Sequence, residues 1–394
     1  MQNLMNKLTH EEAVERAQKL FASIRSRTQE TEKLRYIPDD TIREIRQSGL
    51  VRTLVPARWG GHEMSWKTLA ATTIEVAKAD PSSGWCFALL QLHNWMVAFM
   101  PDAAQADVWG SDPDAGVASS LNPSPDMSVT RVEGGYRLSG KWGFSSGIRH
   151  SDWVIILVPV PSKDGSQGKT THYFLVPKRD FKIHDTWYVS GLKGTGSHQI
   201  ELKDAFVPDY RTMELDPWNL YGESPGGAVN SSPLYRIQLS AVMPATLASV
   251  VLGSAMGAYD EWKINYVGKG KTRTGVPVAE LTHKQIQLAK LSTKLEAARA
   301  LLMQSLDFVE TNSPLEYKDR VRMRCNYAYS VQLCTEVMEE IFATSGAAAS
   351  DEKSLLQLFW RDIHAGAQHM AFNFDWVGEI FGKLELGIPV GVEY

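Results

Sequence analysis

Cysteine is scarce in this sequence, with three residues among 394. Cys86, Cys325 and Cys334 form no C-x-x-C pair and stand at no spacing from histidine that a zinc site requires. The odd count argues against a disulfide framework, and the spacing argues against a metal site. We therefore expect no metal, and three reduced thiols in the core of a cytoplasmic protein.

The sequence also lacks a large net charge and a long hydrophobic run. A net charge of −4 argues against a nucleic-acid surface. The longest apolar stretch, residues 85–100, is interrupted by Gln91, His93 and Asn94 and is too short to span a bilayer. The first 12 residues mix polar and charged side chains, unlike a secretory signal. We expect no nucleic-acid partner and no membrane.

Several well-known motifs are missing as well. Residues 191–196, GLKGTG, fail both G-x-G-x-x-G and the P-loop spacing, and no β-α-β pattern surrounds them. We interpret this segment as a structural turn, so reducing equivalents for any redox reaction must come from elsewhere. The absence of H-E-x-x-H, G-x-S-x-G and carboxylate–histidine iron motifs argues against metalloproteases, α/β-hydrolases and non-haem iron enzymes.

The hydrophobic periods predict two helical parts around a β part. Helical spacing occupies residues 11–35, 38–49, 66–79, 83–100 and 102–109. From about residue 115 the pattern becomes typical of strands, at 128–133, 136–140, 152–160, 170–176 and 198–206. A passage rich in Pro, Gly and Ser, residues 217–233, then separates the strands from a second helical half.

The second helical half has the seam of an antiparallel bundle. Apolar residues recur there at alternating intervals of three and four positions: Leu288, Leu291, Leu295, Ala298 and Leu302. Further helices are expected at about 315–345 and 351–371. The predicted domains are therefore 1–114, 115–216 and 217–394.

Residues 140–147, GKWGFSSG, place aromatics, two hydroxyls and glycines where a strand ends. Such a segment could bring backbone and hydroxyl groups to a flat heterocycle while an aromatic ring covers it. The alternative is a tight turn whose serines bond their own backbone, and these residues alone favour that turn.

Histidines are the other candidates, since they titrate near neutrality. His93, beside Asn94 in an apolar helix, is more often a satisfied core residue than a ligand-binding one. His364 and His369 lie five residues apart, about 140° around an α-helix, and cannot easily share a metal. Arg273 could bind a phosphate or be a solvated basic turn; the two readings are equally supported.

Taken together, the chain resembles the acyl-CoA dehydrogenase superfamily over nearly its whole length. The resemblance rests on the helix–β–helix order, Lys141-Trp142-x-x-Ser-Ser-Gly, residues 191–197 and Asp204-Ala205-Phe206-Val207-Pro208. It implies an α+β fold with an N-terminal helical domain, a central β-barrel-like domain and a C-terminal four-helix bundle. It also implies flavin contacts, with Phe144 against the ring and Ser146 near N5. The remaining implied flavin-binding residues are Trp142, Ser145, Ser120, Asn122 and Arg273.

The C-terminal region departs from the dehydrogenases. Where many of them carry a catalytic glutamate, this sequence has Gln368-His369-Met370-Ala371-Phe372. Loss of the carboxylate base disfavours acyl-CoA dehydrogenation. With Phe359-Trp360-Arg361-Asp362 and His93-Asn94-Trp95, the chain is similar to the oxygenase component of two-component flavin monooxygenases, such as the p-hydroxyphenylacetate, secosteroid phenol and indole or indoleacetate oxygenases.

That resemblance implies an activity. A separate NAD(P)H-dependent reductase supplies FMNH2 or FADH2, and O2 forms a C4a-hydroperoxyflavin that hydroxylates a small aromatic substrate of phenol or indole type. The implied catalytic residues are His369, Ser146 and His93, although His364 is kept as an alternative to His369 for facing the flavin. The implied substrate-binding residues are His93, Asn94, Trp95, Ser120 and Phe374.

The resemblance also implies a homotetramer in which Arg273 serves an adjoining chain. Alternative functions remain open: N-oxidation of an amino sugar, oxidation of an acyl-CoA or nitroalkane, or a flavin-binding scaffold without activity.

Overall fold

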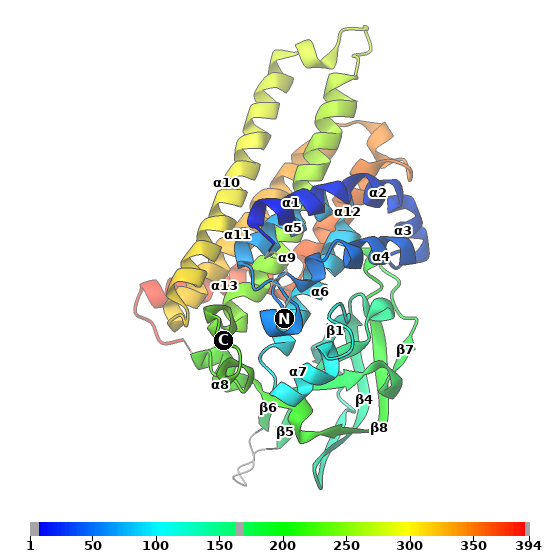
Figure 1. The fold of residues 1–394 in the computed structure, drawn as a ribbon. Coiled ribbons are helices and arrows are strands. Elements are labelled where there is room, and N and C mark those ends of the chain that lie inside the picture. Colours follow the sequence, from blue (N-terminus) through cyan, green and yellow to red (C-terminus); the bar gives the residue numbers. More distant parts are fainter. Residues whose placement is uncertain (1–7, 162–168, 391–394) are drawn as a thin grey trace.

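The computed structural model describes residues 8–161 and 169–390. Helices occupy the N-terminal and C-terminal parts of the chain, and the strands form a separate layer beside them (Figure 1). The N-terminal helices are α1 (His10–Lys19), α2 (Phe21–Ser26), α3 (Thr28–Leu34), α4 (Asp39–Gln47), α5 (Trp66–Ala79), α6 (Pro81–Val97) and α7 (Asp102–Trp109). The last four agree with the helices expected from sequence periodicity.

The first predicted helix, residues 11–35, is divided into three. The chain leaves regular helical geometry at Arg27, with φ −101° and ψ 4°, and α3 ends at Arg35 with a left-handed φ of 60°. Side chains bind different neighbours on either side of this break: Arg25 donates to the Lys78 carbonyl, and Arg27 binds Glu44 of α4. The helical spacing of apolar residues predicted which face is buried, but it did not predict these breaks in the helix.

The strands form two open sheets. One has the order β1 (Val117–Ser120), β5 (Trp153–Pro161), β6 (Lys169–Pro177), β9 (Thr212–Glu214); the other has β2 (Asn122–Pro123), β4 (Gly135–Ser145), β8 (His198–Pro208), β7 (Lys182–His184), with β3 (Ser128–Val132) on β4. Within the described strands no hydrogen-bonded pairing joins the sheets, so the expected barrel does not close. The two sheets instead pack against each other through apolar side chains, including Leu138, Trp142, Ile156 and Phe174.

The C-terminal part is a helical bundle. Its helices are α8 (Leu215–Tyr221), α9 (Leu239–Glu261), α10 (Thr282–Asn312), α11 (Tyr317–Ala343), α12 (Leu355–Ala367) and α13 (Phe374–Glu385). The predicted seam on α10 is confirmed for Leu291, Leu295, Ala298 and Leu302, which are all buried, whereas Leu288 at its start is only partly buried. The helix expected over 351–371 ends earlier, at Ala367, and α13 was not predicted.

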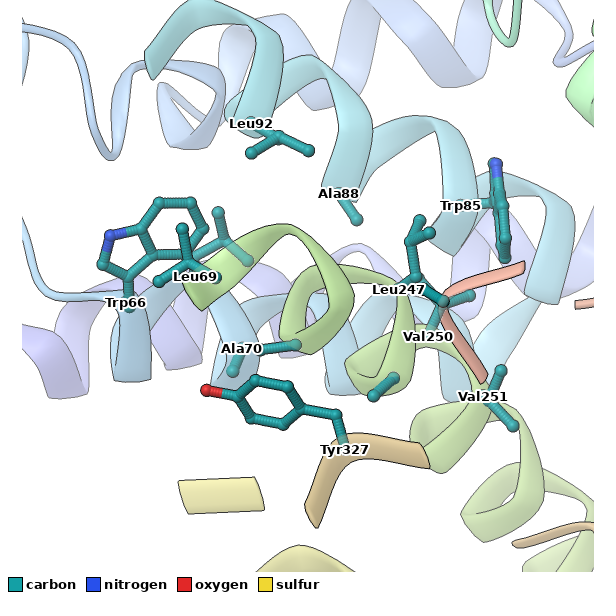
Figure 2. Close-up of a cluster of buried hydrophobic side chains, with 14 of the residues drawn as sticks. Trp66, Leu69, Ala70, Trp85, Ala88, Leu92, Leu247, Val250, Val251 and Tyr327 are labelled. Atoms are coloured by element: carbon teal, nitrogen blue, oxygen red, sulfur yellow. The ribbon is translucent and has the colours of Figure 1, made fainter. Parts of the chain in front are cut away.

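Helix α9 lies at the centre of the main core. Figure 2 shows its side chains Leu247, Val250 and Val251 among residues of α5, α6 and α11. The apolar run 239–268 is long enough to cross a membrane, yet 83% of its most apolar window is buried inside the protein. Its hydrophobicity is therefore explained by the core. The predicted burial of all three cysteines, unpaired, is also confirmed.

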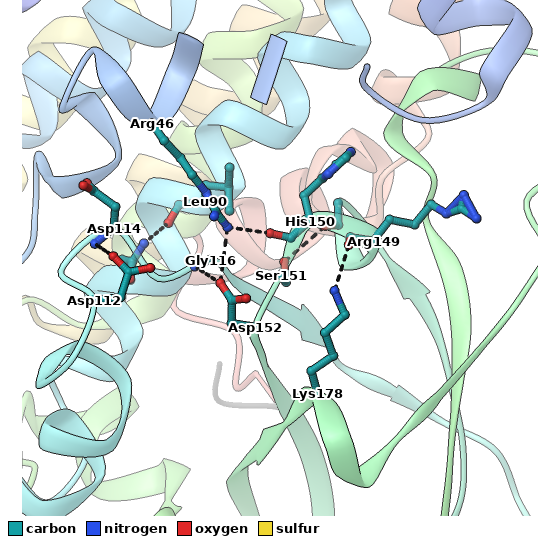
Figure 3. Close-up of polar contacts among 12 residues, drawn as sticks. Arg46, Leu90, Asp112, Asp114, Gly116, Arg149, His150, Ser151, Asp152 and Lys178 are labelled. Carbon is teal, nitrogen blue, oxygen red and sulfur yellow. Dashed lines mark hydrogen bonds and ion pairs between the residues drawn. The ribbon is translucent and has the colours of Figure 1, made fainter. Parts of the chain in front are cut away.

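Polar contacts fix the sheets against the helices. Arg46 of α4 donates to the His150 carbonyl at 2.8 Å and to the Asp152 carboxylate at 3.2 Å (Figure 3). Asp152 in turn accepts the Gly116 N–H at 2.9 Å, just before β1, and the Ser151 hydroxyl donates to the Gly147 carbonyl. The starts of β5 and β1 are thus held by one helix.

The close approach of α9 and α5 gives a stability prediction. A Cβ added at Gly253 would lie 2.6 Å from the Ile74 carbonyl oxygen, so Gly253→Ala must push the helices apart. We expect a destabilisation of about 1–3 kcal/mol, measured as a lower free energy of unfolding. Gly382 of α13 is the matched control, because nothing lies within 4 Å of its Cβ position. Gly382→Ala should stabilise by up to about 1 kcal/mol through helix propensity; equal effects would contradict the packing argument.

Candidate active site

The end of β4 presents one residue outward between two buried ones. We call residues 142–147 the exit segment. Trp142 is fully buried and its indole N–H donates to the Leu157 carbonyl, while Ser145 is buried and donates to the Ser119 carbonyl at 3.1 Å. Between them the register with β8 shifts, and Phe144 adopts a φ of 60°. The segment is therefore a strand with a bulge as far as Ser145, and the bulge points Phe144 outward. The expected turn is present only at Ser146 and Gly147.

Phe144 forms an exposed aromatic corner with Trp187. The Phe144 side chain is 65% exposed, and the two rings meet edge to face with centroids 5.9 Å apart. The Trp187 indole N–H is held by the Leu192 carbonyl at 3.0 Å. A left-handed backbone at a bulky non-glycine residue is costly and is typical of a functional site. An apolar ring edge beside hydroxyls suits a flat, partly polar heterocycle such as a flavin.

Ser146 connects the exit segment to α6 and β8. Its hydroxyl accepts the Trp85 indole N–H at 3.3 Å and shares a hydrogen with the Ser197 hydroxyl at 2.7 Å. The backbone is joined too, because the Gly147 N–H donates to the Thr195 carbonyl at 2.9 Å. The predicted structural turn at 191–196 therefore supports Ser146 directly.

His369 lies next to this cluster. Its ring centroid is 6.3 Å from that of Trp85, the residue whose indole N–H binds Ser146. Helix α12 has already ended, and His369 instead caps the short turn 370–372 by accepting the Ala371 N–H at its Nδ1. The angular separation expected for two histidines on one helix thus does not apply.

The environment of His369 keeps its ring neutral. Burial, together with the positive charge of Arg324, lowers the pKa of His369 to about 4. Because Nδ1 accepts a hydrogen bond, the proton of the neutral ring sits on Nε2. At pH 7 the side chain can therefore offer an N–H donor.

His364 faces a different environment. Its Nε2 pairs with the Glu339 carboxylate at 2.7 Å, and its ring lies 4.5 Å from the Trp360 ring. It lines an open groove of about 750 Å³ that also contains Phe374. Of the two histidines, His369 is therefore the one beside Trp85, which binds the exit segment at Ser146.

The predicted residues of β1 and β2 contact the exit segment from the other side. The Ser120 hydroxyl, buried, donates to the Gly143 carbonyl at 2.6 Å, and Asn122 pairs with Gly143 in the β2–β4 ladder. Ser119, which is half-buried, points toward α6, where its hydroxyl lies 2.9 Å from Nε2 of His93.

His93 has partners at both ring nitrogens. Nδ1 lies 3.1 Å from the Val117 carbonyl, which can only accept, so Nδ1 carries the proton and Nε2 accepts from Ser119. Burial lowers the pKa of His93 to about 4. The next two residues also have hydrogen-bond partners. Asn94 binds the Leu90 carbonyl and the Trp109 indole. Trp95 is buried among aromatic rings and donates to the Leu234 carbonyl.

Arg273 lies away from this cluster. It is exposed in a turn between α9 and α10, at the tip of the helical hairpin that projects from the rest of the chain (Figure 1). The structure therefore does not bring Arg273 to the exit segment of its own chain.

Sequence reasoning missed several residues that build the site: Trp85, Ser119, Thr195, Ser197 and Asp362. Asp362 is buried in α12, accepts the Leu192 N–H at 2.7 Å, and has a pKa raised to about 8 by burial. Ser197 and Thr195 were visible only as part of the resemblance motif. Their roles depend on partners distant in sequence, so no local pattern could reveal them.

The neutral His93 gives a pH prediction. Its folded pKa of about 4 lies below the ordinary 6.5, so between these values the unfolded chain binds a proton that the folded chain does not. Stability therefore falls as the pH falls through this window. From pH 7 to pH 5, wild type should lose about 2 kcal/mol more of unfolding free energy than His93→Gln, measured by urea unfolding. Equal losses in both proteins would contradict a lowered pKa.

Comparisons with known proteins agree with this geometry. Residues 8–109 match the acyl-CoA dehydrogenase N-terminal domain family, and residues 245–374 match the acyl-CoA dehydrogenase C-terminal domain family. The chain is 32% identical to the flavin-dependent monooxygenase oxygenase subunit HsaA of Rhodococcus jostii, covering 96% of this chain and 99% of that one.

Two further relatives are associated with reduced flavin. The oxygenase component of the FADH2-dependent resorcinol hydroxylase of a Rhizobium species is 32% identical, covering 94% of this chain and 93% of its own. The structure of XiaF from a Streptomyces species, in complex with FADH2 and glycerol, superposes with a TM-score of 0.89 at 28% identity, covering 97% of both chains. The chain therefore belongs to the acyl-CoA dehydrogenase superfamily, among the oxygenase components of flavin-dependent monooxygenases.

Proposed function

We propose that this protein uses reduced flavin and O2 to hydroxylate a small aromatic compound of phenol or indole type. The main support is that His369, a neutral N–H donor, lies beside Trp85, whose indole binds Ser146, in the region where the dehydrogenases keep a carboxylate base. The relatives' names, resorcinol hydroxylase among them, favour an electron-rich ring as substrate. One oxygen atom enters the ring and the other leaves as water, with both electrons of the reduced flavin consumed.

The exit segment would hold the flavin. Phe144 offers a ring face or edge, Ser146 offers its hydroxyl near N5, and Trp142 and Ser145 fix the backbone between them. Ser120 and Asn122 would line the same cavity from β1 and β2. Bound reduced flavin supplies the electrons that activate O2; the protein residues bind it, orient it and exclude water.

His369 would act as a hydrogen-bond donor to the oxygen being transferred or to the substrate hydroxyl. Its Nδ1 is already used by the Ala371 N–H, and among the described residues Nε2 has no hydrogen-bond partner. A neutral imidazole with a pKa near 4 donates this hydrogen bond without bringing a positive charge into the site.

His93 would act on the substrate through Ser119. Since both ring nitrogens of His93 are occupied, direct binding of the substrate would require Ser119 to be displaced. Ser119 donates its proton to His93 and keeps its lone pairs for a substrate hydroxyl. We propose that Asn94 and Trp95 hold α6 in place behind it, and that Phe374 contributes to substrate binding from α13.

The assembly and partner follow from the family membership. We propose a homotetramer in which Arg273, at the projecting tip, binds the flavin of a neighbouring copy. We also propose a separate NAD(P)H-dependent reductase that delivers FMNH2 or FADH2 by diffusion, and a cytoplasmic location, consistent with three unpaired thiols. Light scattering of Arg273→Ala with and without flavin would separate a role in assembly from one in binding.

The activity is tested with chemically reduced FMN or FAD, ¹⁸O2 and a panel of phenols, indoles and amino sugars. We expect one labelled oxygen atom in a phenol or indole, detected by mass spectrometry. If the labelled oxygen is found on the nitrogen of an amino sugar, the alternative function, amino-sugar N-oxidation, is correct and the aromatic hydroxylase is not. Anaerobic bleaching of bound oxidised flavin by an acyl-CoA would instead support a dehydrogenase and overturn the proposal.

The role of His369 is tested by substitution. Loss of a donor that acts on the reacting oxygen typically lowers turnover by about 10²–10³, so His369→Ala should lose hydroxylated product to that extent while still binding reduced flavin. His364→Ala is the matched control, since His364 faces Glu339 instead, and it should hydroxylate like wild type. A fully active His369→Ala protein would remove this residue from the mechanism.

A further inference from the structure

A chain of four hydrogen bonds passes through Ser146. It begins at the Trp85 indole N–H, 3.3 Å from Ser146 Oγ. It continues from Ser146 to Ser197 Oγ at 2.7 Å and from Ser197 to Thr195 Oγ1 at 2.7 Å. It ends at the Leu192 carbonyl, 2.9 Å from Thr195 Oγ1. The residues come from α6, the exit segment and the loop before β8.

The two ends fix the direction of this chain. An indole N–H can only donate and a carbonyl can only accept, whereas each hydroxyl has a single proton. Thr195 donates its proton to the Leu192 carbonyl at 2.9 Å, which also accepts the Trp187 indole N–H at 3.0 Å and the Thr195 N–H at 3.2 Å. Thr195 Oγ1 therefore accepts from Ser197. Ser197 has then spent its own proton and must accept from Ser146.

Ser146 is therefore left with one lone pair and no proton to give. Its proton points to Ser197, and its other lone pair receives the Trp85 N–H. Reduced flavin carries a proton on N5, whereas oxidised flavin has a bare acceptor there. We propose that this one-way chain makes Ser146 an acceptor that selects the reduced flavin over the oxidised one. The inference rests on the proposed placement of Ser146 near N5.

The far end of the chain resists reversal. Thr195 and Ser197 are 1% and 5% exposed, so water cannot replace a lost bond there. With the chain reversed, the Thr195 and Leu192 oxygens would face each other at 2.9 Å without a proton between them. The Leu192 backbone, at φ 53°, is itself held by the Asp362 carboxylate. Selection at Ser146 is thus set by residues that need not touch the flavin.

The test measures dissociation constants of oxidised and reduced FMN and FAD under anaerobic conditions. Wild type should bind the reduced form more tightly. Thr195→Val removes the hydroxyl that sets the direction, so Ser197 can donate to Ser146 and Ser146 can donate to oxidised N5. The preference for reduced flavin should fall about three- to tenfold, the usual effect of one hydrogen bond. The potential of the bound flavin should fall with it, by about 30 mV for a tenfold change.

Thr195→Ser is the matched control, because it keeps the hydroxyl and should keep the preference. Ser197→Ala frees the Ser146 proton and should lower the preference as well, which covers the case that Thr195→Val does not fold. An unchanged preference in a folded Thr195→Val or Ser197→Ala protein overturns the inference and leaves the proposed function standing. Equal binding of oxidised and reduced flavin by the wild type also overturns the inference and leaves the proposed function standing. A wild type that binds neither form overturns the proposed function itself.

Discussion

The buried hydrogen bond from the Leu192 N–H to the Asp362 carboxyl group joins the C-terminal helices to the part of the sheets that carries the exit segment. It is possible only because residue 191 is glycine: a Cβ there would lie 2.2 Å from the Arg361 carbonyl oxygen. The turn can therefore lie directly on α12. The positions of Thr195, Ser197 and Ser146 depend on it, and so does the direction of the hydrogen bonds that end at the Ser146 hydroxyl.

Trp85 connects this polar arrangement to the hydrophobic core. One side of the indole packs among the core residues of α6 and α9 (Figure 2), while its N–H reaches Ser146 and its ring approaches His369. A shift of α6 would therefore change the contacts of Trp85 with both the Ser146 hydroxyl and His369. Core packing and site geometry depend on the same side chain, which is why the site needs no ion pair to position Ser146.

The sequence predicted those features that depend on local periodicity or on family motifs. Helices α5 and α7 and the α10 seam follow from burial of one helical face, and the motif around Ser146 located the exit segment. The open sheets were not predicted, because closure depends on pairing between distant strands. His369 was expected inside a helix, since nothing in its neighbours shows that α12 ends at Ala367. The apolar helix around His93 predicted that this residue is buried. Its hydrogen-bond partners, Val117 and Ser119, could not be predicted because they lie on β1, distant in the sequence.

The left-handed backbone at Phe144 restricts which sequences this site can accept. A side chain branched at Cβ clashes with the backbone at positive φ, so Val, Ile and Thr are disfavoured there regardless of how well they would cover a ligand. Unbranched flat rings and asparagine are better tolerated. The ring contact that Phe144 offers can therefore be changed only through a narrow set of replacements, and evolution or engineering that needs a smaller aliphatic side chain must introduce it on another strand.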